Sequence, residues 1–270
     1  MKIVILGSKG FVGRNLTEHL AKTHRVFPLS RDVINLLNFD EVTKFLKEYN
    51  PDFVINAAAT MTQASTISDT RNNLGIFMNF YNSRHLFGRF LNLGSGAEFD
   101  RSKNINIASS EDIFNILPED SYGFGQNVKA RLSATTENFF NLRIFNCFGW
   151  GEIPTRIFPK FINSSDPLTV DDRLFDYFSI QDLCTVVDYY VTEHEPKHKD
   201  INCVYRSKRL ISDTMKIFKD ITGIDKKIVV TSVNKHNYTG DPKELFYLGL
   251  ELLELEKSFE LYAEKVHKDV

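Results

Sequence analysis

Three glycines directly after a short apolar run constrain the start of the chain more than any other feature. The run from Ile3 to Leu6 ends at Gly7, and Gly10 and Gly13 follow at GxxGxxG spacing before an amphipathic stretch. In a strand–turn–helix unit the first glycine permits a tight turn, the second lets backbone N–H groups approach a pyrophosphate, and the third allows close helix–sheet packing. An ordinary strand–helix turn is the alternative, but this context favours dinucleotide binding. The predicted cofactor turn consists of Gly7, Ser8, Lys9, Gly10, Phe11, Val12 and Gly13.

Short apolar runs alternate with helix-length amphipathic stretches from the N-terminus to Phe148, as in repeated βα units around a parallel sheet. We expect helices after residues 11, 40, 69 and 122. The expected strands are Ile3 to Leu6, Arg25 to Leu29, Phe53 to Asn56, Phe90 to Leu93 and Leu142 to Phe145. The predicted fold is therefore α/β, with a Rossmann-type doubly wound parallel sheet in an NAD(P)-binding domain over residues 1–150.

The alternation of apolar runs and amphipathic stretches becomes less regular after Phe148, where several prolines occur. We expect residues 151–270 to form a smaller C-terminal α/β lobe that mainly binds substrate and is interleaved with the first domain. Its expected helices lie near residues 181–193, 210–222 and 249–268. Its expected strands and apolar runs are Leu168 to Val170, Phe175 to Phe178, Ile201 to Tyr205 and Ile228 to Val233.

The overall charge and the cysteines exclude several classes of protein. A formal net charge of -2 gives no electrostatic reason to expect a nucleic-acid or anionic-membrane partner. The three cysteines have no CxxC spacing, so neither a disulfide framework nor a zinc site is indicated. The apolar run Ile3 to Leu6 is too short for a signal peptide or a membrane span. We therefore expect a cytoplasmic protein without a metal.

Several segments resemble the extended short-chain dehydrogenase/reductases, the NAD-dependent epimerase/dehydratase family. The glycine spacing matches this family, and so does the alanine-rich turn Ala57, Ala58 and Ala59, which would let a cofactor lie against the backbone. Asn73 matches a position where the family often has asparagine. The segment from Arg31 to Leu36 resembles the sugar-nucleotide 4-keto reductases, such as GDP-fucose synthase and dTDP-4-dehydrorhamnose reductase. The resemblance implies an oxidoreductase with a nucleotide-sugar substrate and a homodimeric assembly.

The residues after the second expected strand bear on the choice of cofactor. NAD preference needs an acidic residue there for the ribose hydroxyls, whereas NADP preference needs cations for the 2′-phosphate. Arg31 lies two residues beyond this strand, and Lys9 occupies a turn position where GDP-fucose synthases have a basic residue. Lys9 and Arg31 together favour NADP(H). NAD(H) is the alternative if Asp32 turns inward to a ribose.

Carbonyl reduction needs a proton donor at the nascent alkoxide and hydrogen bonds that fix the carbonyl. Ser95, after the fourth expected strand, resembles the family's substrate-orienting hydroxyl, and Tyr122 resembles the tyrosine of its YxxxK motif. Gln126 stands where the family has lysine, so it can hydrogen-bond to a ribose but carries no charge to stabilise a phenolate. Lys129 lies about two helical turns beyond Tyr122, near the same helical face, and would replace that lysine only through a bent helix or a long reach. A solvated side chain is the favoured interpretation.

Residues that related chemistries require are missing. Family dehydratases have an Asp-Glu pair where this chain has Gly96 and Ala97, and GDP-fucose synthases epimerise with a cysteine at the position of Ala97 and a histidine beyond the fifth strand. The segment from Gly149 to Pro159 contains no histidine. The motifs therefore favour reduction without epimerisation.

A sugar nucleotide carries a diphosphate, so the second lobe should supply cations. Arg156 and Lys160 are four residues apart and would share one face of a helix. Phe175 stands where a family motif has arginine, and Arg173, two residues earlier, would compensate on the same strand face.

The leading hypothesis is an NADPH-dependent reductase of a nucleotide-linked 4-keto-6-deoxy sugar, with Tyr122 as proton donor and Ser95 orienting the carbonyl. The enzyme alternative is an NAD-dependent C4 epimerase of sugar nucleotides. A third hypothesis, favoured by Gln126, is a catalytically weakened protein that binds the cofactor or the sugar nucleotide.

Overall fold

Six parallel strands form the central sheet of the computed structural model, which describes residues 1–59, 66–231 and 235–268. The sheet order is β10-β6-β4-β3-β1-β2, and its strands are Lys2–Leu6 (β1), Arg25–Leu29 (β2), Phe53–Asn56 (β3), Arg89–Ser95 (β4), Phe139–Ile144 (β6) and Asp200–Cys203 (β10). The strand order reverses between β1 and β3, which leaves a crevice at their carboxyl ends. The predicted Rossmann-type α/β fold is confirmed.

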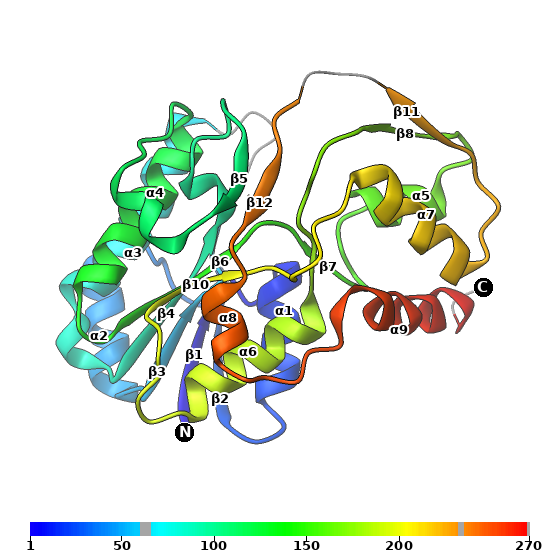
Figure 1. Ribbon diagram of the computed structural model, residues 1–270. Coiled ribbons are helices and arrows are strands. Elements are labelled where there is room, and N and C mark those ends of the chain that lie inside the picture. The colour runs from blue at the N-terminus through cyan, green and yellow to red at the C-terminus, as the bar shows by residue number, and fades with distance from the viewer. Residues whose placement is uncertain (60–65, 232–234, 269–270) are drawn as a thin grey trace.

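Helices cover both faces of the sheet. Figure 1 shows α2 (Phe39–Tyr49), α3 (Ile67–Asn82) and α4 (Ser121–Thr135) on one side, and α1 (Phe11–Leu20) and α6 (Ile180–Thr192) on the other. Alternate residues of β1 enter the two resulting cores, Ile3 and Ile5 in one and Val4 and Leu6 in the other. Strands buried on both faces have continuous apolar sequences, which is why β1 and β3 could be placed from the sequence.

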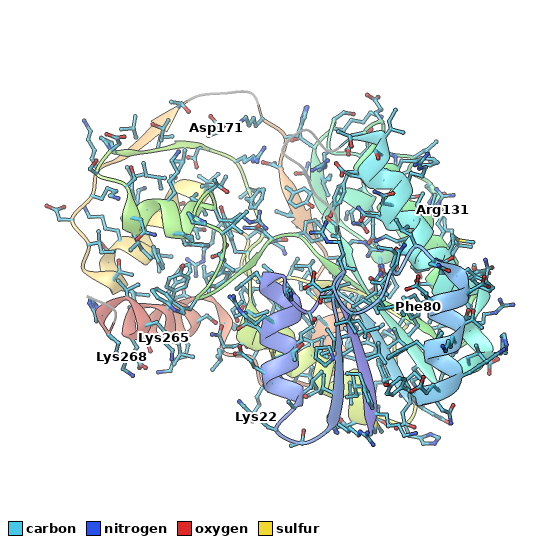
Figure 2. All side chains as sticks on the ribbon, turned by 180° about the vertical axis from the view of Figure 1, so that it is seen from behind. Lys22, Phe80, Arg131, Asp171, Lys265 and Lys268 are labelled. Carbon is cyan, nitrogen blue, oxygen red and sulfur yellow. The ribbon has the colours of Figure 1, made fainter. Side chains whose placement is uncertain are left out.

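A smaller lobe lies beside the sheet. It contains the helices α5 (Ile157–Asn163), α7 (Ile211–Thr222) and α9 (Glu254–Lys268), and the parallel pair β8 (Leu168–Asp171) and β11 (Ile228–Thr231). Figure 2 shows Asp171, Lys265 and Lys268 in this lobe, opposite Phe80 and Arg131 on the far flank of the sheet. Within the described ranges, none of the helices is both long and apolar enough to cross a membrane.

Several elements of the second half return to the first. Strand β10 pairs with β6 in the central sheet, and α6 packs against α1. Strand β12 (Tyr238–Gly240) pairs with β5 (Ile105–Ala108), and α8 (Lys243–Tyr247) packs against β10. The division into residues 1–150 and an interleaved substrate lobe over 151–270 stays our proposal.

Several predicted elements of the second half have different bounds, and two differ most. The expected strand Phe175 to Phe178 is reduced to β9 (Phe178–Ser179), which pairs with β7 (Cys147–Phe148), while Phe175 makes only an isolated bridge to Tyr238. The C-terminal helix begins at Glu254 rather than near residue 249. The reason is that the Asp182 carboxylate accepts hydrogen bonds from the backbone N–H groups of Leu253 and Glu254, at 2.8 and 3.1 Å. Residues 232 and 233 of the expected run Ile228 to Val233 lie outside the described residues.

Polar side chains link neighbouring strands through the buried interior of the sheet. Asn56, Asn92 and Asn141 lie side by side on β3, β4 and β6. The Asn56 amide donates to the Asn92 carbonyl at 3.0 Å, and the Asn92 amide donates to the Asn141 carbonyl at 2.7 Å. Each buried amide is thereby provided with a partner, as buried polar groups must be.

This row of amides ends at a buried ion cluster. Arg143 is fully buried on β6, and its guanidinium donates to Glu98 at 2.6 Å and to Asp200 at 2.8 Å. Asn202 takes a third hydrogen bond at 2.8 Å. Glu98 in turn accepts the backbone N–H of Ser95 at 2.9 Å, so the cluster fixes the loop after β4.

Replacing Arg143 by an uncharged residue tests how much the ion cluster contributes to stability. Arg143→Met leaves two buried carboxyl groups without their partner, and we expect the free energy of unfolding to fall by about 3–5 kcal/mol. Urea denaturation followed by circular dichroism measures the change. The control Arg84→Met alters an exposed arginine and should cost less than about 0.5 kcal/mol. A similarly small loss for Arg143→Met would contradict the anchoring role.

Candidate active site

The three predicted glycines form the turn between β1 and α1, but they are required for different reasons. Gly7 has a φ of +73°, and a Cβ there would lie 2.7 Å from the Ala57 carbonyl oxygen. A Cβ on Gly13 would lie 2.2 Å from the Gly7 carbonyl oxygen, which rules out any side chain. A Cβ on Gly10 would have the Gly7 carbonyl oxygen, at 3.3 Å, as its neighbour. Steric contacts therefore require glycine at positions 7 and 13. At position 10 the absence of a side chain would let a pyrophosphate come close to the backbone N–H groups.

Lys9 in this turn forms an ion pair with Asp32, just beyond β2. The hydrogen bond and charge of Lys9 lower the pKa of the Asp32 carboxyl. Arg31 is exposed beside this pair. If Lys9 and Arg31 bind one phosphate as expected, Lys9 must first break its ion pair with Asp32. The Asp32 carboxylate could alternatively accept hydrogen bonds from ribose hydroxyls.

A cavity of about 380 Å³ opens at the carboxyl ends of the central strands. On the side of the glycine turn its wall includes Val12, Ala57, Ala58 and Ala59. The predicted catalytic residues Ser95, Tyr122 and Gln126 all line it. Its remaining wall includes Arg101, Phe145, Arg156, Arg173, Phe175, His236, Asn237 and Tyr238. The topology thus brings Val12 of the predicted cofactor turn, the alanine-rich turn, the catalytic candidates and residues of the second half of the chain to one cavity.

Ser95 ends β4 and is held by a reciprocal pair of hydrogen bonds. Its backbone N–H donates to the Glu98 carboxylate at 2.9 Å, and the Ala97 N–H donates to the Ser95 hydroxyl at 3.2 Å. This capping box begins a short 3-10 helix over Gly96–Glu98. The serine that the sequence predicted therefore has a fixed backbone and one occupied hydroxyl lone pair.

Tyr122 lies in the first turn of α4. Asp120 caps this helix by accepting the Gly123 N–H at 2.8 Å, and Arg101 forms a two-point ion pair with Asp120, at 2.7 and 3.2 Å. The Arg101 guanidinium lies 5.6 Å from the centre of the Tyr122 ring. Burial raises the pKa of Tyr122, although hydrogen bonds with Ser95 and Gln126 and the charge of Arg101 oppose the rise. The phenol is therefore a proton donor that stays protonated at neutral pH.

Gln126 lies one helical turn beyond Tyr122 and is buried. Its carbonyl oxygen Oε1 has no hydrogen-bond partner among the described residues. An unsatisfied buried acceptor is costly, and a ribose hydroxyl would provide the missing donor. Gln126 thus fits a bound dinucleotide. Asn73 is buried on α3 and does not line the cavity.

Lys129 is buried rather than solvated, so the prediction of a surface lysine was wrong. Its side chain is 2% exposed, because α4 packs against the sheet and the 3-10 helix that follows Ser95. Burial lowers the pKa of Lys129 to about 8, with the Glu98 charge opposing the change. Lys129 does not line the cavity.

The predicted substrate cations are divided by the fold. Arg156 and Arg173 line the cavity, and Arg173 lies with its guanidinium 5.0 Å from the centre of the Phe175 ring. Lys160 is exposed and does not line the cavity. Helix α5 begins only at Ile157, so Arg156 precedes the helix and does not share a helical face with Lys160.

Sequence reasoning missed two cavity residues that carry polar groups close to Tyr122. Arg101 is six residues beyond Ser95, and this closeness in sequence to the serine segment could have indicated that it lies in the site. Tyr238 had no signal, since only the pairing of β12 with β5 brings it to the cavity.

Comparison with known proteins places the whole arrangement in one family. The model of the NAD dependent epimerase/dehydratase family matches residues 3–203. CDP-abequose synthase of Yersinia pseudotuberculosis is 32% identical over an alignment of 120 residues, and the match covers 38% of this chain and 42% of that protein. The match to this curated relative thus spans less than half of its length.

Two solved structures from Campylobacter jejuni superpose on nearly the whole chain. A GDP-D-glycero-L-gluco-heptose synthase, determined in the presence of NADPH, has a TM-score of 0.82 at 20% identity and covers 99% of this chain and 98% of its own. A GDP-mannoheptose C4 reductase with NADP bound has a TM-score of 0.80 at 21% identity, with the same coverage. At these identities the likeness shows the fold.

The glycine turn predicts a contrast between two alanine substitutions. Gly10→Ala should leave the melting temperature nearly unchanged and weaken binding of the predicted dinucleotide about tenfold or more, because the new methyl group stands in the approach to the pyrophosphate. Gly13→Ala should lower the melting temperature, because its Cβ meets the Gly7 carbonyl oxygen. Thermal unfolding and isothermal titration with NADPH and NADH measure both effects. Undiminished binding by Gly10→Ala would contradict the assignment of the turn.

Proposed function

The chain belongs to the NAD dependent epimerase/dehydratase family, and we propose that it is an NADPH-dependent reductase of a nucleotide-linked 4-keto-6-deoxy sugar. The observation that carries this proposal is the acid group of the cavity. Tyr122 is a phenol with a raised pKa, and the residue one turn along its helix is the neutral Gln126. Family membership supports the sugar-nucleotide class, and the acid group supports the direction of the reaction.

A protonated phenol suits reduction better than oxidation. Reducing a ketone consumes a proton, so the donor must hold one at neutral pH, and a raised pKa ensures this. Oxidising an alcohol requires the phenolate as a base, and burial without a neighbouring lysine disfavours that form. A C4 epimerase must perform both half-reactions at the same carbon. The acid group therefore supports a reductase over an epimerase.

The residues of the cavity have separable tasks in this reaction. Ser95 donates a hydrogen bond that orients the carbonyl oxygen, and Tyr122 releases its proton to that oxygen as the alkoxide forms. The resulting phenolate is stabilised by the hydrogen bond of Gln126 and by the Arg101 charge, which both act to lower the pKa of Tyr122. When bound, the nicotinamide supplies the hydride that reduces the carbonyl carbon. Gly10 and Gln126 are the residues that fit its dinucleotide.

The same cavity lacks groups for epimerisation or dehydration at the family positions. Gly96 and Ala97 provide no acid or base after Ser95. Cys147 lines the cavity, but burial raises the pKa of its thiol well above the usual range, which keeps the thiol protonated at neutral pH. These features support reduction without a change of configuration at neighbouring carbons.

Two arginines support a substrate that carries a diphosphate. Arg156 is exposed at the cavity wall, and the Nε of Arg173 is buried without a hydrogen-bond partner among the described residues. A guanidinium with a free N–H group matches a phosphate oxygen in charge and geometry. Both cations thus line the cavity and are available to a diphosphate.

The cofactor preference rests on the charges beyond β2. Lys9 and Arg31 provide two cations against the single carboxylate of Asp32, and this excess supports NADPH. Retained NAD would instead support the epimerase alternative, and Gln126 supports the alternative of a weakened cofactor-binding or sugar-nucleotide-binding protein. The homodimer and the cytoplasmic location expected from the sequence stay predictions.

The pH dependence of the two reaction directions tests the role of Tyr122. Because its raised pKa keeps the phenol protonated, the rate of keto-sugar reduction should be flat from about pH 6 to pH 9 and fall only as the pH passes the raised value. The rate of alcohol oxidation should rise throughout that interval. Tyr122→Phe should lower kcat for reduction by about 100-fold or more, with the Kd for NADPH unchanged. Steady-state kinetics and titration of the cofactor provide these values.

Gln126→Lys is the matched variant. A lysine cation would lower the pKa of Tyr122, so the rise of alcohol oxidation should move to lower pH. An unchanged oxidation profile in this variant, or full reduction by Tyr122→Phe, would contradict the proposed chemistry. Absence of turnover in both the native protein and Gln126→Lys would favour the binding-protein alternative.

A further inference from the structure

Tyr238 brings a second phenol to the Ser95 loop from a distant part of the chain. It is the first residue of β12 and is 8% exposed. Its ring packs between those of Phe145 and Phe175, with ring centres 4.8 and 5.2 Å away. Its hydroxyl lies 2.7 Å from the position that a Cβ on Gly96 would occupy. A phenylalanine would fill the aromatic part of this site equally well, so the hydroxyl requires its own explanation.

Tyr238 lies at one end of an irregular strand pairing. Tyr238 pairs with Ile105 and Gly240 pairs with Ala108, so β5 uses one more residue than β12 between the same two pairs. Within this bulge Ile107 has a φ of +49°, a strained conformation for a β-branched residue, and its N–H donates to the Thr239 hydroxyl at 2.9 Å. Bulges of this kind redirect side chains next to functional sites.

The hydrogen bonds of Ser95 show what the second phenol does. A serine hydroxyl has one hydrogen to donate and two lone pairs that accept. The Ala97 N–H occupies one lone pair, at 3.2 Å. Tyr122 and Tyr238 line the same cavity as Ser95, and Ser95 acts on both phenols, lowering the pKa of each. Burial raises the pKa of Tyr238 far above its usual range, so this phenol keeps its proton and can donate it to the second lone pair. The single hydrogen of Ser95 then remains for Tyr122 or for a carbonyl oxygen bound in its place.

We propose that Tyr238 is a positioning residue that donates to Ser95 and thereby fixes Ser95 as a donor to the carbonyl oxygen of the substrate. This inference rests on the proposed function. Tyr238 acts through Ser95, so its loss should affect the reacting geometry more than the binding of the substrate.

The substitution Tyr238→Phe removes only the hydroxyl. We expect kcat for keto-sugar reduction to fall about 10- to 100-fold, while KM stays within about twofold, because the carbonyl is less well oriented. In a Ser95→Ala background the same substitution should have no further effect, because its target is absent. The control Tyr81→Phe, on α3 away from the cavity, should leave kcat unchanged. An unchanged kcat in Tyr238→Phe, or an equal loss in both backgrounds, would overturn the proposal.

A spectroscopic test separates this proposal from the proposed function. If the native protein turns over no nucleotide-linked keto sugar, the proposed function fails, and Tyr238 is judged by NMR of protein labelled with 13Cζ-tyrosine. The Tyr122 signal, assigned by its loss in Tyr122→Phe, should shift in Tyr238→Phe, and this shift should vanish in the Ser95→Ala background. A Tyr122 signal that does not respond to Tyr238→Phe overturns the proposal whatever the activity.

Discussion

The ion cluster of Glu98, Arg143 and Asp200 joins the sheet interior to the loop that carries the candidate chemistry. Arg143 bridges both carboxylates, and Glu98 uses its other oxygen to hold the Ser95 N–H. Burying these charges is costly, and the cost is offset only while every partner is present. A cluster of this kind tolerates little movement, so the end of β4 is held in one position. Both Ser95 and the residues packed around it depend on that rigidity.

The environment of Tyr122 is compatible with carbonyl reduction although Gln126 replaces the lysine cation of the family motif. Gln126 supplies no cation, but it provides a hydrogen bond to the phenol and an unused acceptor oxygen that suits a ribose hydroxyl. Arg101 is tied to Asp120 and lies over the ring, so its charge acts on the phenol at a distance. The resulting acid keeps its proton at neutral pH. The proposed reductase needs only that form, whereas an enzyme that alternates between oxidation and reduction needs both.

Features set by local sequence were predictable, and features set by tertiary packing were not. The glycine turn and the continuous apolar strands follow from backbone geometry and burial on both faces, so the fully buried β3 agrees with its predicted bounds. Ser95 and Tyr122 were predicted because their segments resemble motifs of the family, and both residues line the cavity. Lys129 was misjudged because helical spacing does not say which face the sheet covers. Tyr238 could not be found, since its contacts depend on a bulged pairing of distant strands.

The most direct test of the central claim follows the hydride. Each of the two C4-deuterated forms of NADPH is incubated with the protein and a nucleotide-linked 4-keto-6-deoxy hexose, and the product is analysed by mass spectrometry and NMR. A reductase with Tyr122 as its acid should transfer deuterium from one of the two forms to sugar C4, with one NADPH oxidised for each sugar reduced. A product without deuterium from either form, or no oxidation of NADPH, would contradict the account.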